Sequence, residues 1–222
     1  MFTVNSSKKV LLTRRSVLKA GAVAAFALAV GITPTVVKAD TAQDAPKNPL
    51  QKGFIYDQSK CINCKMCVNA CKEVNQWEEG TVWRRVLAGG KDGKHYLSYS
   101  CNHCEDPACA SVCPVLAYKK RDEDGIVIHN PDVCVGCKYC MFACPYHVPQ
   151  FSPATGRINK CHFCYERQDK GEKPACVSAC PTRALNFGLL SDIRKTSGAT
   201  AQLEGMPNPE LTKPSWVLIP KA

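Results

Sequence analysis

The chain has 222 residues, 16 of them cysteine, and a formal net charge of +10. Six of its basic side chains and none of its acidic ones lie in residues 1–39, so the remaining 23 basic side chains face 19 acidic ones and leave only +4. The basic balance therefore gives no reason to expect a nucleic-acid partner.

Residues 1–39 have the pattern of an export signal. Arg14 and Arg15 form the pair of a twin-arginine motif, an apolar run at 20–33 follows, and residues 37–39 fit a small-residue cleavage site. The apolar run is shorter than the roughly 20 residues that a membrane helix needs. We therefore expect a twin-arginine signal peptide, a location in the periplasm or on the exported side of the cell envelope, and no membrane span in the mature chain.

Short strands and turns are predicted around the cysteines. Residues 40–52 are polar and contain proline, and we expect a flexible linker there. Residues 53–57 then alternate enough for a short strand. Two β-hairpins are expected at 82–100 and 117–129, where strand-like segments bracket a Gly-rich turn and an acidic turn.

The third group of cysteines is the most specific motif in the chain. Cys134, Cys137, Cys140 and Cys144 precede Pro145 in the order C-x2-C-x2-C-x3-C-P, which bacterial ferredoxins use for cubane iron–sulfur clusters. Three thiolates at this spacing wrap one corner of a cluster from a tight loop. The fourth begins a helical turn that points away from the loop, so it serves a second cluster. The proline fits because the chain leaves that turn extended and needs no amide donor there.

Three further groups of four follow the same logic and complete the 16 cysteines. The first keeps the spacing but precedes Lys72, the second has a middle gap of four residues, and the fourth has eleven residues inserted. Their members are Cys61, Cys64, Cys67 and Cys71; Cys101, Cys104, Cys109 and Cys113; and Cys161, Cys164, Cys176 and Cys180. Predicted strands before and after the groups indicate four copies of one unit, an internal repeat.

Disulfides and zinc are the alternative uses of so many cysteines. Export favours disulfides, but cysteines at this spacing on one turn rarely bridge. Zinc takes pairs of C-x2-C motifs and not three-plus-one runs that end in Cys-Pro. Twin-arginine export moves folded proteins, so clusters can be built before the chain reaches an oxidising compartment. His103 and His162 lie inside the loops, and we expect them to pack or to bond amides because each group already has four cysteines.

The end of the chain leaves the repeat. Residues 206–222 contain four prolines, and we expect 191–222 to be an extended C-terminal tail laid on the surface of this chain or of a partner. The sequence contains no phosphate-binding loop, dinucleotide fingerprint or nucleophile–base motif, which predicts a protein that is not catalytic by itself.

The chain resembles a known family. Its segment 101–109 (CNHCEDPAC), the third and fourth cysteine runs and the end at 212–214 are similar to the four-cluster iron–sulfur subunits of the dimethyl sulfoxide reductase family. The resemblance covers roughly residues 53–220. It implies an α+β, irregular and loop-rich fold of two nested ferredoxin-like modules with β-hairpin insertions. The first module would comprise 53–100 with 146–190, and the second 101–145.

The resemblance also implies which cysteines share a cluster, although spacing alone leaves consecutive pairing of the groups open. Set A is Cys61, Cys64, Cys67 and Cys180; set B is Cys71, Cys161, Cys164 and Cys176; set C is Cys101, Cys104, Cys109 and Cys144; set D is Cys113, Cys134, Cys137 and Cys140. Nitrate reductase-like relatives have tryptophan and a three-iron cluster where Cys137 stands, so its presence here implies four [4Fe-4S] clusters.

Such subunits carry electrons from a quinol-oxidising membrane subunit to a molybdopterin-containing catalytic subunit in anaerobic respiration. The wider group serves tetrathionate, polysulfide and nitrite reductases, and these alternatives remain because the chain has a leader of its own, as the nitrite and tetrathionate types do. The terminal substrate and the electron donor, a membrane subunit or a cytochrome, stay open. Four lysines lie next to or inside the loops: Lys65, Lys72, Lys138 and Lys160. Each could raise the reduction potential of the nearest cluster. For each lysine taken singly, we favour the alternative that it is an ordinary solvated surface charge.

Overall fold

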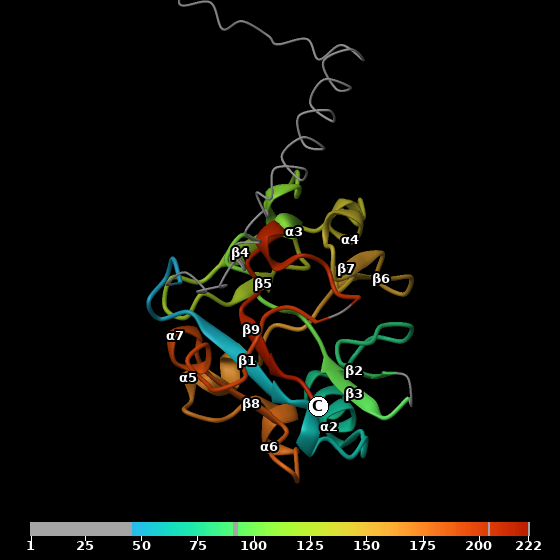
Figure 1. Ribbon diagram of the computed structural model, residues 1–222. Helices are drawn as coiled ribbons and strands as arrows, with labels where there is room; N and C mark the ends of the chain where they lie inside the picture. Colours follow the sequence, from blue (N-terminus) through green and yellow to red (C-terminus); the bar gives the residue numbers. More distant parts are fainter. Residues whose placement is uncertain (1–45, 91–92, 204, 222) are drawn as a thin grey trace, which may run out of the picture. The chain divides into compact units, whose positions relative to one another are not determined.

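The structure, a computed structural model, describes residues 46–90, 93–203 and 205–221. The expected signal peptide at 1–39 and the first part of the expected linker lie outside these residues. The described part is a small mixture of short helices, short strands and loops, as the α+β, loop-rich expectation requires (Figure 1).

Each cysteine group lies between a strand that leads into it and a strand that returns from it. The leading strands are β1 (Lys52–Asp57), β3 (His95–Tyr99), β5 (Val127–His129) and β7 (Arg157–Asn159), and the return strands are β2 (Arg85–Gly89), β4 (Tyr118–Lys120), β6 (Gln150–Ser152) and β8 (Leu185–Leu189). The helices are α2 (Met66–Asn75), α3 (Ala108–Ser111), α4 (Tyr139–Ala143), α5 (Tyr165–Asp169), α6 (Ala175–Ser178) and α7 (Leu190–Ile193), with 3-10 turns η1 (Gln58–Lys60) and η2 (Pro209–Leu211). The fourfold alternation agrees with the internal repeat read from the cysteine spacing.

The strands pair in a closed succession. Each of the first three return strands pairs antiparallel with the next leading strand, as β2–β3, β4–β5 and β6–β7. The first two of these pairs are the hairpins predicted at 82–100 and 117–129, which are thereby confirmed. The last return strand, β8, pairs antiparallel with the first leading strand, β1. The two ends of the repeat therefore meet in one sheet.

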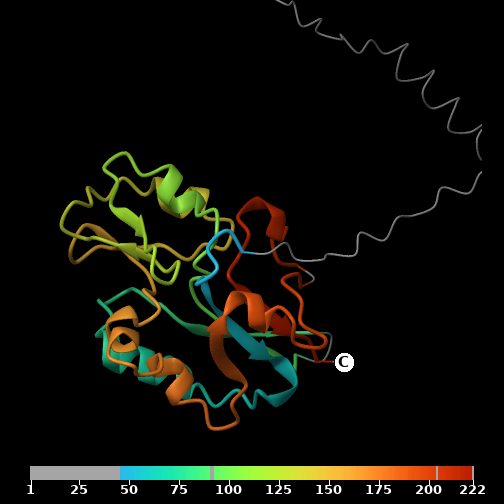
Figure 2. The same ribbon diagram turned by 90° about the vertical axis from the view of Figure 1, so that its left-hand side faces the viewer.

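The helices pack in two pairs. α2 from the first group packs against α6 from the fourth, and α3 from the second packs against α4 from the third. Figure 2 shows the cyan and orange segments together in one lobe and the yellow-green segments that follow residue 100 together in another. Most buried cysteines belong to the two larger apolar clusters, so the interior is built around the sulfur atoms.

The first repeat unit departs from the expected single helical turn. α2 has ten residues and continues past Cys71 to Asn75, whereas α4 has five residues and ends just before Cys144. Pro145 follows Cys144, but Lys72 follows Cys71. The proline restricts the residue before it to an extended conformation, and only the first group lacks this stop signal.

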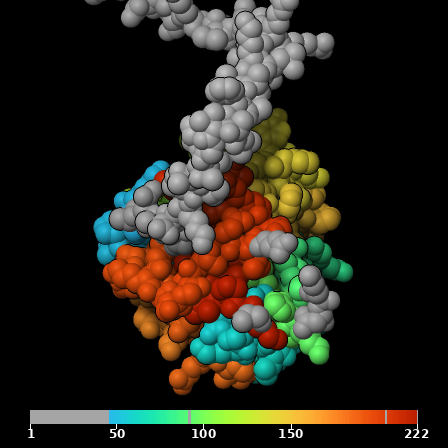
Figure 3. Space-filling model, viewed as in Figure 1, coloured from blue at the N-terminus to red at the C-terminus, as the bar shows by residue number. Residues whose placement is uncertain are grey.

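The C-terminal segment is more deeply integrated than the expected surface tail. Strand β9 (Trp216–Ile219) pairs parallel with β1 on the side opposite β8, and Trp216, Val217 and Leu218 are buried. Four apolar, strand-favouring residues gain more by completing a sheet than by lying on its surface. Figure 3 shows the orange and red segments spread across the face that it displays.

The end of the expected flexible linker is also held in place. Gln51 is fully buried, and its side chain donates to the Gly125 carbonyl at 3.1 Å and accepts from Lys120 Nζ at 2.7 Å. The Lys47 amide donates to Glu105 Oε2 at 2.8 Å. The polar composition of this segment suggests that its side chains are solvated, but these hydrogen bonds connect it to the rest of the protein. Residues 46–52 are therefore part of the fold.

Candidate metal centres

All four cysteine loops share one backbone feature. The second residue after the first cysteine has a left-handed conformation in each of them: Asn63 (φ 56°), His103 (φ 44°), Gly136 (φ 67°) and Phe163 (φ 59°). This conformation is uncommon for residues with a side chain. In two of the loops it turns an amide toward the first sulfur: the His103 amide donates to Cys101 Sγ at 3.5 Å and the Phe163 amide to Cys161 Sγ at 3.3 Å.

The cysteines followed by proline form a second repeated turn. After Cys113, Cys144 and Cys180, the third residue along is left-handed and its amide donates to the cysteine carbonyl, at 3.3, 3.0 and 3.2 Å. The sulfur of Cys113 also accepts from the Ala117 amide at 3.3 Å, and that of Cys180 from the Leu185 amide at 3.5 Å. Amide donors at the sulfur are suited to a thiolate that carries negative charge.

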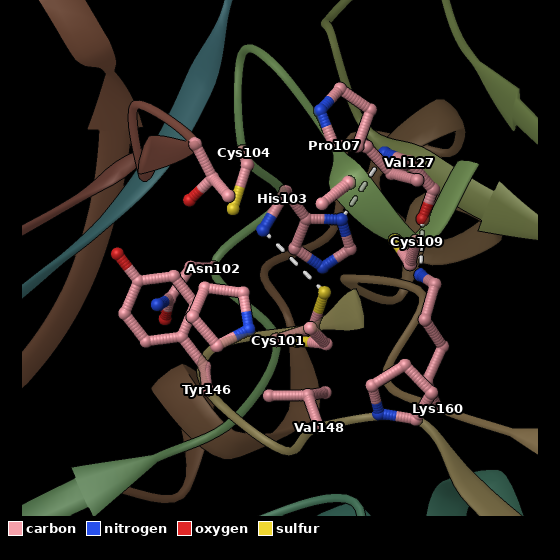
Figure 4. Close-up of a pocket in the computed structure, with 15 residues that line it drawn as sticks. Cys101, Asn102, His103, Cys104, Pro107, Cys109, Val127, Tyr146, Val148 and Lys160 are labelled. Atoms are coloured by element: carbon pink, nitrogen blue, oxygen red, sulfur yellow. Dashed lines mark hydrogen bonds between the residues drawn. The ribbon is translucent and has the colours of Figure 1, made fainter. Parts of the chain in front are cut away.

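One pocket brings the members of set C together. Cys101, Cys104, Cys109 and Cys144 line it, with Lys160, Tyr146 and Val148 among its other walls (Figure 4). The space free of protein atoms in and around this pocket, open solvent included, is about 380 Å³. The second and third cysteine groups therefore meet here, with three sulfurs from one and the fourth from the other.

Two further pockets gather sets D and A in the same way. The members of set D, Cys113, Cys134, Cys137 and Cys140, line a pocket of about 260 Å³. The members of set A, Cys61, Cys64, Cys67 and Cys180, line one of about 330 Å³. In each case three cysteines come from one group and the fourth from the group that is its partner in the nested order.

Two members of set B, Cys71 and Cys164, lie beside Asn75 at the end of α2. The side-chain amide nitrogen of Asn75 lies 3.5 Å from Cys71 Sγ and 3.9 Å from Cys164 Sγ. Burial raises the pKa of the Cys71 thiol, and the neighbouring Cys161, Cys176 and Cys164 thiols raise it further. Cys71 from the first group is thus close to three cysteines of the fourth.

The sulfur atoms do not have the arrangement of a mononuclear metal site. All 16 cysteines are unpaired thiols. In the part of the chain that the structure describes, no three His, Cys, Asp or Glu side chains converge closely enough to hold one ion. A tetrahedral zinc site needs four ligands within about 2.3 Å of one centre, whereas a cubane gives each thiolate its own iron corner and so separates them. Pockets whose walls carry four separated sulfurs fit a cluster and do not fit zinc.

Burial makes the unligated thiols inert. It raises the pKa of Cys101 to about 11 and the pKa values of Cys104 and Cys176 to about 12. Since the metal ligand is the thiolate, iron binding must displace these protons. Such thiols are poor nucleophiles at neutral pH, so the pockets are not suited to thiol catalysis.

Neighbouring sets approach one another in the order A, B, C, D. Burial is the largest cause of the raised pKa of Cys176 in set B, and Cys67 of set A contributes. Likewise burial is the largest cause of the raised pKa of Cys101 in set C, and Cys161 of set B raises it further. Tyr118 stands between the last two sets: its ring lines the set D pocket, and after burial its pKa is raised by Cys140 of set D and Cys109 of set C. Cys64 in set A and Cys137 in set D are exposed, whereas the other 14 cysteines are buried or half-buried.

The lysines beside the loops separate into two kinds. Lys65, Lys72 and Lys138 are exposed, but Lys138 Nζ lies over the Phe151 ring at 3.9 Å, so the expectation of a solvated charge fits Lys65 and Lys72 only. Lys160 is buried, and its Nζ donates to the Val127 carbonyl at 2.5 Å and to the Cys161 carbonyl at 3.0 Å, on the wall of the set C pocket (Figure 4). It lowers the pKa of Cys101, against the larger effect of burial.

His103 acts as the sequence predicts for a histidine in a loop that already has four cysteines. Its Nδ1 accepts a hydrogen bond from the Val127 amide at 3.2 Å, and its ring stacks on Phe163 at a centroid distance of 5.1 Å. Burial first, and then the charges of Lys160 and Lys120, hold its pKa well below the usual value. His103 is therefore a neutral, buried residue that packs on Phe163 and accepts a hydrogen bond from the Val127 amide.

Sequence patterns did not identify Arg84, which is fully buried beside several cysteines. Its only signal is the hairpin register: Arg85 pairs with Tyr99, which places Arg84 opposite Ser100.

Among the described residues, no helix has the length and apolar character needed to cross a membrane.

The comparisons with known proteins agree with this geometry. Residues 93–190 match a family described as a 4Fe-4S dicluster domain, and residues 54–73 match a 4Fe-4S binding domain. The chain is 45% identical over 185 residues to the B subunit of anaerobic dimethyl sulfoxide reductase from Escherichia coli (strain K12), a match that covers 78% of this chain and 90% of the relative. It is 41% identical over 152 residues to protein NrfC of the same strain, which covers 65% of this chain and 68% of that protein. It is also 36% identical over 213 residues to hydrogenase-2 operon protein HybA of Escherichia coli O157:H7, which covers 82% of this chain and 64% of that protein.

Proposed function

The chain belongs to the family of iron–sulfur electron-transfer subunits that includes the B subunit of dimethyl sulfoxide reductase, and from this premise we propose that it carries four [4Fe-4S] clusters between two partner subunits of a respiratory reductase. It is a non-catalytic subunit that binds [4Fe-4S] clusters. The observation that carries the proposed number is the division of 16 cysteines into four sets of four with none left over.

We propose the nested assignment of ligands, with one cluster held by each of sets A, B, C and D. The pairing of β1 with β8 and the packing of α2 on α6 support a first module built from the first and fourth groups. The packing of α3 on α4 supports a second module built from the second and third groups. The first module would comprise 53–100 with 146–190 and the second 101–145.

Each cluster, when bound, supplies a one-electron acceptor and donor. The protein's own contribution is to hold the cysteine loops in left-handed turns, to bury most of the sulfurs and to direct amide donors at several of them. Burial and hydrogen bonds to sulfur are among the factors that set reduction potentials. Because sets A and D each contain an exposed cysteine, electrons enter and leave at these two ends, and B and C form the protected middle of the path.

The partners that we propose are a molybdopterin-containing catalytic subunit and a quinol-oxidising membrane subunit, in a complex most similar to dimethyl sulfoxide reductase. A tetrathionate, polysulfide or nitrite reductase system is the second candidate, because residues 1–39 have the sequence pattern of a leader. The twin-arginine motif at residues 14–15 supports a location on the periplasmic side in either case.

A coulometric titration of the full-length protein, purified without oxygen, tests the proposal. We expect the protein to take up one electron for each of the four clusters in separate one-electron steps. A protein that takes up no electrons would contradict electron transfer. Uptake of half as many electrons, with the remaining cysteines occupied by another metal, would contradict the cluster number while keeping the family function.

A further inference from the structure

Arg84 is a buried cation without an anionic side chain to balance it. It is 1% exposed and lies just before β2. Its guanidinium donates from Nη1 to Ser98 Oγ at 2.9 Å and from Nη2 to Ser100 Oγ at 2.7 Å, and it lies over the Phe54 ring at 4.8 Å. Its Nε has no partner in the described structure, and none of the ion pairs among those residues involves it. A buried charge with only neutral partners is strongly unfavourable.

Cysteines supply the compensation that carboxylates do not. Although burial opposes the charge, the Cys176, Cys161, Cys71 and Cys67 sulfurs, in this order, raise the pKa of the guanidinium and so favour its charged form. Three of these belong to set B, and Cys67 belongs to set A. A cubane with four thiolates carries a formal charge of about −2 when oxidised. The guanidinium is therefore coupled electrostatically to ligands of both sets, and Ser98 links it directly to Cys67 of set A.

Ser98 connects Arg84 to set A through a hydrogen bond of defined direction. Arginine only donates hydrogen bonds, so Ser98 Oγ accepts from Arg84 and its own hydrogen remains free to be donated. Cys67 Sγ lies 3.4 Å from this oxygen. When Cys67 is a metal-bound thiolate it accepts only, and Ser98 must be the donor. Ser100 holds the other arm of the guanidinium and has no hydrogen bond to a cysteine among the described residues.

We propose that Arg84 raises the reduction potentials of the clusters in sets A and B by its charge and, for set A, also through the hydrogen bond that Ser98 donates to Cys67. The proposal rests on the proposed cluster assignment. Reduction adds a negative charge to a cluster, so a fixed cation and a hydrogen bond to a ligand sulfur favour the reduced form.

The test is a potentiometric titration of the full-length holoprotein, followed by electron paramagnetic resonance. In Arg84→Met we expect the reduction equilibria of two clusters to fall by at least tenfold, which is a drop of about 59 mV in midpoint potential for one electron, while the other two stay unchanged. Arg84→Lys keeps the charge and should shift them less. Arg85→Met removes a neighbouring, half-buried charge and is the matched control, with a smaller shift than Arg84→Met.

The two serines provide a second, gentler comparison. Ser98→Ala and Ser100→Ala each remove one acceptor of Arg84, but only Ser98→Ala removes the donor to Cys67. We expect Ser98→Ala to lower the potential of one cluster and Ser100→Ala to lower none by a comparable amount. If Arg84→Met fails to assemble its clusters, the comparison of the two serine variants tests the proposal instead.

Two outcomes would overturn the proposal. One is an Arg84→Met protein with four intact clusters and unchanged potentials, or with equal shifts in all four. The other is an equal effect of the two serine changes. If the wild-type protein itself lacks four clusters, the proposed function fails instead, and iron analysis of the same sample distinguishes that failure from this one.

Discussion

Gly136, between Cys134 and Cys137, allows a test of one cluster site at a time. It has φ of 67°, and a Cβ atom at this position would overlap the carbonyl oxygen of Gly156 on the β6–β7 turn. Placing an L-residue in this conformation costs about 1–2 kcal/mol. Relieving a clash with backbone costs about 1–3 kcal/mol more. Gly136→Ala should therefore destabilise this loop by about 2–5 kcal/mol.

Gly156 supplies the matched control. Its φ is also 67°, but a Cβ atom there meets no heavy atom within 4 Å. Gly156→Ala should therefore lose only the conformational part, about 1–2 kcal/mol, and keep its full iron content. Gly136→Ala should lose or alter the cluster of set D alone, because the clash displaces the loop that carries three of its four ligands.

Iron analysis, electron paramagnetic resonance and thermal unfolding of the two variants are the assays. We expect one altered cluster signal and the lower melting temperature in Gly136→Ala only. If Gly136→Ala is as stable and as rich in iron as Gly156→Ala, the close approach of the two turns is not present in the protein, and the account of set D is refuted.

Three further predictions concern other parts of the chain. Cys137→Trp should convert one four-iron cluster to a three-iron form, seen as a new signal of the oxidised protein near g of about 2, and full iron content with no such signal would show that Cys137 is not a ligand. Replacing Arg14 and Arg15 by lysine keeps the charge but loses the guanidinium pair, so the unprocessed protein should accumulate in the cytoplasm with its clusters intact; continued export without a signal-bearing partner would show that the motif is incidental. Trp216→Ala should lower the free energy of unfolding by about 3–5 kcal/mol, since Trp216 is buried in the core, whereas the exposed Leu211→Ala should change it little; equal melting temperatures would show that β9 adds nothing to the fold.

The cysteine pattern was sufficient for the parts of the structure that depend on local geometry. The spacing of the four groups predicted the repeated loops, and the strand-like segments around them predicted β1 and the two hairpins. Pro145 and its equivalents mark where the short helices end, and their absence after Cys71 explains the longer α2. Each of these features is determined by residues close together in the chain.

Features that depend on contacts between distant residues did not follow from the sequence. The partner of a group's fourth cysteine is not encoded in spacing, because nested and consecutive pairing use the same residues. β9 joins β1 from the far end of the chain, and its four apolar residues alone do not distinguish a sheet edge from a surface segment. Arg84 has the composition of a surface residue, and only the register of β2 on β3 brings it beneath the cysteines.

The iron and acid-labile sulfide content of the full-length protein, purified without oxygen, tests the central claim most directly. Four cubane clusters predict about sixteen iron and sixteen sulfide per chain with no stoichiometric zinc. About eight iron per chain, stoichiometric zinc, or cysteines oxidised to disulfides would contradict the assignment of one cluster to each set of four.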